Sequence, residues 1–205
     1  MKIAEIMKKM IDFSDGNIHD IDHFIRVWTY ARTIAQLEGL DADTQYILEV
    51  AAITHDIACP LCREKYGNTN GKHQETEGAP MVRSFLRDTG LTEAQIDRVA
   101  FLVGHHHTFT DVHGSDYQIL LEADCIANAS ENGYERRNVE NFIQKIMWTE
   151  SGKALAKAVF ASEIQSILSS RAQKGLACIS RVSPFACIEF SEKEKKSSFQ
   201  ATFCA

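Results

Sequence analysis

The apolar positions along this chain recur with a helical period. From residue 2 to about residue 170 they are spaced three or four apart, which places them on one face of an α-helix. The clearest stripe lies in residues 20–38 and consists of Ile21, Phe24, Val27, Trp28, Ala31, Ile34 and Ala35. No strand is expected before residue 175, and the sequence shows no internal repeat. The pattern therefore predicts an all-α fold.

Residue types that begin and end helices divide this periodic region. Gly39 suits the C-terminal end of the helix over residues 20–38, and Asp41 is a good N-cap for the next helix, which runs to His55. Similar signals predict helices over residues 76–88, 92–103, 116–130 and, as two helices, 135–170, after an amphipathic first helix at the N-terminus. Pro60 and the glycine- and asparagine-rich residues 66–71 indicate a loop.

The length of the chain is suited to one domain. It has 205 residues, of which 44% are hydrophobic, enough to bury a sizeable core. We expect a single helical domain over residues 1–170. The pattern changes near residue 174, where residues 177–182 and 185–190 are compatible with a β-hairpin. Residues 171–205 are therefore expected to form a C-terminal extension of unknown role.

Charge and hydropathy exclude several classes of partner. The net charge is −6 at pH 7, which argues against a nucleic-acid polymer because such partners select basic surfaces. No apolar run reaches the length of a membrane span. The N-terminus carries lysines without a compact apolar stretch and cleavage site, unlike a signal peptide. The sequence predicts a cytoplasmic protein without a membrane partner; a homodimer remains compatible with it.

The cysteines indicate reduced thiols. Their spacing is irregular, and they are Cys59, Cys62, Cys125, Cys178, Cys187 and Cys204. Cys59 and Cys62 form one Cys-x-x-Cys pair, whereas a structural zinc site needs further ligands at suitable spacing. We expect this pair neither to bind metal nor to form a disulfide.

Candidate chemistry comes from histidine and aspartate at the ends or on the inner stripes of the expected helices. Four groups share this placement: His19 with His23, His55 with Asp56, His105 to His107, and Asp124. Any one of them is more often a satisfied core residue than a ligand. A buried carboxylate such as Asp124 is nevertheless costly unless it is paired or binds a metal. The four groups together predict a metal site between the core helices.

These residues carry a resemblance to a family. Residues 19–27 (HDIDHFIRV), 51–57 (AAITHDI) and 121–124 (LEAD) resemble the motifs of the HD-domain superfamily of metal-dependent phosphohydrolases. The resemblance covers roughly residues 15–150 and implies an all-α, HD-type domain. It implies a divalent metal ion as cofactor, with iron, manganese, nickel, cobalt, zinc and magnesium all open.

The resemblance also implies roles for single residues. The metal ligands would be His23, His55, Asp56 and Asp124, with His106 as a further ligand, and Asp56 and His106 would be catalytic. Members with two metals use additional histidines, for which His19, His73 and His107 are the candidates. By the family's spacing to the following glycine, however, Gln74 falls at the position of one of these histidines. One ion and two ions therefore both remain open.

The expected chemistry is hydrolysis by a metal-activated water. The segment after the His-Asp pair, residues 59–72, is expected to be a loop that forms one wall of the substrate pocket and moves as a lid. Within it, Arg63, Lys65 and Lys72 are candidates to bind phosphate through charge-assisted hydrogen bonds, although a solvated basic loop would look the same.

The function that follows is hydrolysis of a phosphate ester or anhydride of a nucleotide or another small metabolite. Two alternatives remain open at the level of sequence. One is a di-iron HD-type oxygenase, which complete ligands for a second metal would favour. The other is a non-catalytic metal- or ligand-sensing HD domain, in which the ligands could be lost freely.

Overall fold

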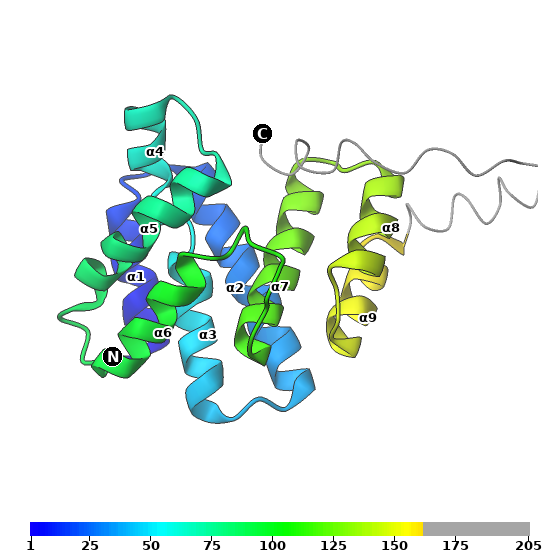
Figure 1. The fold of residues 1–205 in the computed structure, drawn as a ribbon, viewed down its shortest axis with the longest axis horizontal. Helices are drawn as coiled ribbons and strands as arrows, with labels where there is room; N and C mark the ends of the chain where they lie inside the picture. The colour runs from blue at the N-terminus through cyan, green and yellow to red at the C-terminus, as the bar shows by residue number, and fades with distance from the viewer. Residues whose placement is uncertain (162–205) are drawn as a thin grey trace, which may run out of the picture.

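Nine α-helices and no strands make up residues 1–161, the part of the chain that the computed structural model describes (Figure 1). The helices are α1 (Ile3–Phe13), α2 (Ile18–Glu38), α3 (Ala42–Thr54), α4 (Cys59–Tyr66), α5 (Gly71–Leu86), α6 (Glu93–Val103), α7 (Ser115–Glu131), α8 (Arg136–Lys145) and α9 (Glu150–Val159). The predicted all-α class is confirmed. The hairpin expected within residues 171–205 lies outside the described residues.

The centre of the fold is the packing of α2 against α3 and α7 (Figure 1). The apolar stripe predicted on α2 is largely buried, with Phe24, Val27, Ala31, Ile34 and Ala35 at 1% exposure or less. His23 lies on the same buried side of the helix. Burial of this stripe therefore also directs an imidazole into the interior.

The turn between α2 and α3 follows its predicted caps. Gly39 adopts φ 71°, a left-handed conformation that costs a glycine little. The Asp41 side chain accepts hydrogen bonds from the backbone N–H groups of Asp43 and Thr44. The tight turn makes α2 and α3 neighbours, so that residues at the start of α2 and the end of α3 lie close together.

The loop expected over residues 59–72 is wrong for most of its length. Residues Cys59–Tyr66 form α4, and α5 begins at Gly71 instead of near residue 76. Pro60 lies in the first turn of α4, where its missing N–H is no loss and its fixed φ suits a helix. The real connection is residues 67–70, which begins at Gly67 with φ 70°.

The α8–α9 pair packs on the far side of the α2–α7 pair from α4 and α5 (Figure 1). A fully buried acid of α7, Glu122, accepts hydrogen bonds from the backbone N–H groups of Trp148 and Thr149 at 2.6 and 2.9 Å. These bonds satisfy backbone donors at the start of α9. None of the helices in residues 1–161 combines the length and the apolar character that crossing a bilayer requires.

Candidate metal centre

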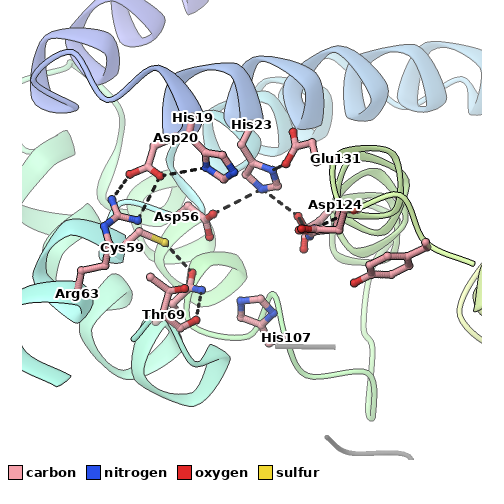
Figure 2. A pocket seen from close by; sticks show the side chains of 14 residues that line it. His19, Asp20, His23, Asp56, Cys59, Arg63, Thr69, His107, Asp124 and Glu131 are labelled. Carbon is pink, nitrogen blue, oxygen red and sulfur yellow. Dashed lines mark hydrogen bonds and ion pairs between the residues drawn. The ribbon is translucent and has the colours of Figure 1, made fainter. Parts of the chain in front are cut away.

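Three helices bring the predicted core ligands together, and Figure 2 shows three of these ligands, His23, Asp56 and Asp124. The Nε2 atom of His23, on α2, lies 3.1 Å from Nε2 of His55, which follows α3. The same Nε2 atom is 3.5 Å from Oδ2 of Asp56 and 3.3 Å from Oδ1 of Asp124, on α7. His55 Nε2 lies 3.6 Å from Asp56 and 3.7 Å from Asp124. Two imidazoles and two carboxylates thus face one small volume.

Backbone carbonyls orient two of the imidazoles. Nδ1 of His55 lies 2.9 Å from the carbonyl oxygen of Ala52, and Nδ1 of His106 lies 2.7 Å from that of Val103. In this arrangement each Nδ1–H donates to the carbonyl, and each Nε2 keeps its lone pair for the centre of the site. Both histidines are fully buried, so their neighbours fix these orientations.

The ring nitrogens of His106 and His107 indicate that the site suits a metal. His106 Nε2 lies 3.3 Å from Oδ1 of Asp56, yet the buried Nε2 atoms of both histidines lack a hydrogen-bond partner among the described residues. There are two groups of potential ligands, and within each group the ligand atoms all lie within 4.8 Å of one another. One group is His23, His55 and Asp56, and the other is Asp56, His106 and His107. Nitrogen and carboxylate donors of this kind fit a divalent first-row ion.

The carboxylates of the site are held ionised. Burial disfavours the charge on Asp56, but His55 and His106 outweigh it and hold the pKa of this carboxyl well below its usual range. Burial likewise lowers the pKa of His23, but hydrogen bonds to Asp124 and Glu131 outweigh this and raise it to about 11. Without a metal, a proton on His23 thus neutralises carboxylate charge, which is the role a bound cation would take over.

His23, Asp56, His107 and Asp124 form the floor of a cavity of about 320 Å³, whereas the fully buried His55 and His106 do not line it (Figure 2). The residues predicted from sequence contribute part of its lining. The residues that sequence reasoning missed are Asp20, Thr69, Asn128, Glu131, Asn132 and Tyr134. Three of them, Asn128, Glu131 and Asn132, continue the α7 face of Asp124 at helical spacing. A search along that face for further polar residues would therefore have found them.

Glu131 is the missed residue in direct contact with a predicted ligand. Its Oε2 atom lies 2.8 Å from Nδ1 of His23, opposite the ring nitrogen that faces the other ligands (Figure 2). Its Oε1 atom lies 3.9 Å from Nε of Arg26. Arg26 follows His23 by one helical turn and is thus within ion-pair distance of Glu131.

Two of the additional histidine candidates lie apart from the group. His19 lines the cavity, but its side chain is 81% exposed and its nearest charged partner is Asp20, at 3.7 Å. His73 stacks on the ring of Tyr66, with 3.8 Å between centroids, and does not line the cavity. His107, in contrast, lines the cavity beside His106. The structure therefore brings one of the three additional candidates to the ligand group.

Gln74 and Cys59 are hydrogen-bonded to each other in the wall of the cavity. The Cys59 thiol donates to Oε1 of Gln74 at 3.3 Å, and Nε2 of Gln74 donates to the carbonyl oxygen of Thr69 at 2.7 Å. Burial raises the pKa of the Cys59 thiol and keeps it neutral. Cys59 and Cys62 are both buried free thiols. The amide of Gln74 is thus engaged at both ends.

One of the three predicted phosphate-binding cations lies at the cavity. Arg63 lines it, where its guanidinium pairs with Asp20 (Figure 2). Lys65 instead pairs with Glu77, with Nζ and Oε1 2.7 Å apart, and Lys72 is exposed; neither residue lines the cavity. The three side chains were expected on a single loop, but Arg63 and Lys65 lie two residues apart on α4 and Lys72 lies on α5.

An all-α fold with a histidine and aspartate group between its core helices defines the class of this protein. The sequence model of the HD domain matches residues 20–143, and the chain therefore belongs to the HD domain family. This match includes all the candidate ligands of the group, which are His23, His55, Asp56, His106, His107 and Asp124.

Two solved structures share the fold. One is described as a predicted HD superfamily hydrolase from an uncultured Thermotogales bacterium; it is 22% identical with a TM-score of 0.59, over 83% of this chain and 91% of that chain. The other is the Lin1889 protein from Listeria innocua, 17% identical with a TM-score of 0.51, over 89% of this chain and 100% of that chain. No protein of curated function matches the sequence.

Proposed function

We propose that this protein is a metal-dependent hydrolase that cleaves a phosphate ester or anhydride of a nucleotide or another small metabolite. The observation that carries the proposal is the convergence of His23, His55, Asp56 and Asp124, of which His23, Asp56 and Asp124 line the cavity. Membership of the HD domain family supports it. So does the shared fold with a protein described as a predicted HD superfamily hydrolase.

The four core residues would hold a divalent ion. When bound, such an ion lowers the pKa of a water towards neutrality and polarises a phosphoryl oxygen. Asp56 lies at the exposed end of the group, where its ionised carboxylate would accept a hydrogen bond from a water at the ion and orient it. His106, whose Nε2 lies 3.3 Å from Asp56, is fully buried and does not line the cavity, so its role would be that of a further ligand or of a partner that holds Asp56.

The cavity walls suggest how a phosphorylated substrate would be held. Arg63 is the lining cation on α4, and Asp20 holds its guanidinium at the mouth of the cavity. A phosphate would compete with Asp20 for the same fork of N–H donors. The amides of Asn128 and Asn132 lie on the α7 side. A volume of about 320 Å³ suits a small metabolite.

A second candidate function rests on the shared position of Asp56. This carboxylate belongs to both groups of potential ligands, one with His23 and His55 and the other with His106 and His107. A carboxylate shared in this way could bridge two ions, as a di-iron oxygenase requires. Gln74 lacks an unengaged ligand atom, which favours one ion and hydrolysis.

Metal analysis and substrate assays test the proposal together. We expect the purified full-length protein to retain about one divalent ion and to release phosphate from members of a panel of nucleotides and sugar phosphates. Two iron atoms and substrate-dependent oxygen consumption would favour the oxygenase. Bound metal with neither phosphate release from this panel nor oxygen consumption would favour a sensing role and contradict the proposal.

A further inference from the structure

The C-terminal half of α7 presents a polar face to the candidate metal centre. Asp124, Asn128 and Glu131 follow one another at helical spacing, and Nδ2 of Asn128 donates to Oδ1 of Asp124 at 2.7 Å. All three residues line the cavity. One helix therefore brings a candidate ligand and a second acid, Glu131, to the same site.

Glu131 is placed against the preferences of its own helix. It is the last residue of α7, where the partial negative charge of the helix end disfavours a carboxylate. Its side chain is only 13% exposed, and its buried Oε1 atom has no hydrogen-bond partner among the described residues. A solvated surface acid would have neither property. The close contact of this carboxylate is with Nδ1 of His23, at 2.8 Å, whereas Nε of Arg26 lies 3.9 Å from Oε1.

His23 depends on this contact more than its neighbours depend on theirs. His55 and His106 direct Nδ1 to carbonyl oxygens of their own helical turns, and this arrangement follows from the backbone. His23 has a side-chain partner instead, reached across from another helix. A carboxylate in this position fixes the tautomer of a metal-binding imidazole and strengthens its other nitrogen as a ligand.

We propose that Glu131 is a positioning residue of the metal centre, which holds Nε2 of His23 towards the ion and increases its basicity. The inference rests on the proposed metal binding and goes beyond it. Glu131 belongs to neither group of potential ligand atoms. It acts through His23, and its removal leaves the four ligands in the chain while making one of them a weaker and less ordered donor.

The test is the affinity of the full-length protein for Co²⁺, measured by competition with a chelator and followed by the visible absorption of the bound ion. Glu131→Ala should weaken Co²⁺ binding about 10- to 100-fold. Glu131→Gln keeps an acceptor for Nδ1–H but loses the charge, so its loss should be smaller but measurable. The matched control is Glu49→Gln, since Glu49 is also buried but bonds to Trp28 and Arg32 on another part of α2.

The outcomes separate this inference from the proposed function. Failure of the wild-type protein to bind Co²⁺ would overturn both. Wild-type affinity in either Glu131 variant would overturn the positioning role alone, as would a Gln variant no better than the Ala variant. A comparable loss in Glu49→Gln would show that any lost buried carboxylate weakens binding, and would also overturn it.

Discussion

The floor and the rim of the cavity differ in what holds their side chains in place. On the floor, His23 and Asp124 are buried and lie on the inner sides of α2 and α7, next to His55, which is buried at the end of α3. On the rim, Arg63 extends from α4 and pairs with Asp20, whereas Lys65 of the same helix points away from the cavity and pairs with Glu77. Packing of the core determines the first set, whereas the nearest available acid determines the second.

This difference explains which predictions from sequence succeed. A polar residue on an apolar stripe must point inward, because the stripe is buried as a unit. A long cation on a surface helix has no such constraint, since its charge can be satisfied in several directions. The expected convergence of Lys65 and Lys72 with Arg63 therefore had no physical basis beyond their proximity in the chain.

The largest effect is expected on the floor. Asp124→Ala should abolish metal retention, because it removes a carboxylate ligand. Its Oδ1 atom lies 3.3 Å from Nε2 of His23 and 3.7 Å from Nε2 of His55. Elemental analysis measures the metal, and circular dichroism should show that helical content largely survives. The control is Glu122→Gln on the same helix, which should retain metal because Glu122 faces the α8–α9 pair. Wild-type metal content in Asp124→Ala would contradict the assignment.

A smaller effect is expected on the rim. Arg63→Gln should raise KM for a phosphorylated substrate about tenfold, equivalent to about 1.4 kcal/mol, with metal content unchanged. The reason is that Arg63 lines the cavity beside Asp20. Steady-state kinetics on an identified substrate provide the measurement.

Lys65→Gln and Lys72→Gln are the matched controls for Arg63. Both remove one positive charge from the same region without altering the cavity lining, so KM should change less than twofold, as for a surface charge. If the three variants raise KM equally, the general field of the region binds phosphate, and the distinction between Arg63 and the two lysines is wrong.

The smallest effect is expected for the two thiols after the His-Asp pair. Replacing Cys59 and Cys62 together by Ala should leave the metal content unchanged, because burial raises the pKa of Cys59 and the neutral thiol is a poor ligand. The buried positions should cost stability, which thermal unfolding will show. Metal analysis of the double variant decides the point, and loss of the ion would make the cysteines ligands.

The fold could be predicted from the sequence wherever a residue type has one strong local meaning. Gly39 and Asp41 end and begin helices as expected. Proline is common both where a helix is interrupted and in the first turn of a helix. The sequence pattern predicts an interruption at Pro60, and this prediction is wrong, because Pro60 lies in the first turn of α4. Which of the two applies depends on whether Cys59 and Cys62 are buried, as they are in the structure. That burial depends on distant parts of the chain and cannot be deduced from the local sequence.

The candidate site shows the same limit. His23, His55, Asp56 and Asp124 could be proposed because a stripe or a motif marks each of them. Glu131 could not, since its partner His23 is on another helix, and only the register between α2 and α7 brings the two residues together. Register depends on the packing of many side chains at once, so a pairwise contact of this kind is visible only in three dimensions.

The position of α4 also has a consequence for how proteins of this architecture can diverge. Arg63 and the connection at residues 67–70 belong to a segment outside the α2–α3–α7 packing that fixes the candidate ligands. Insertions or substitutions there would reshape the mouth of the cavity while the buried ligand group keeps its geometry. If the proposed function holds, remodelling this single short helix would change which substrate the cavity accepts without rebuilding the ligand group beneath it.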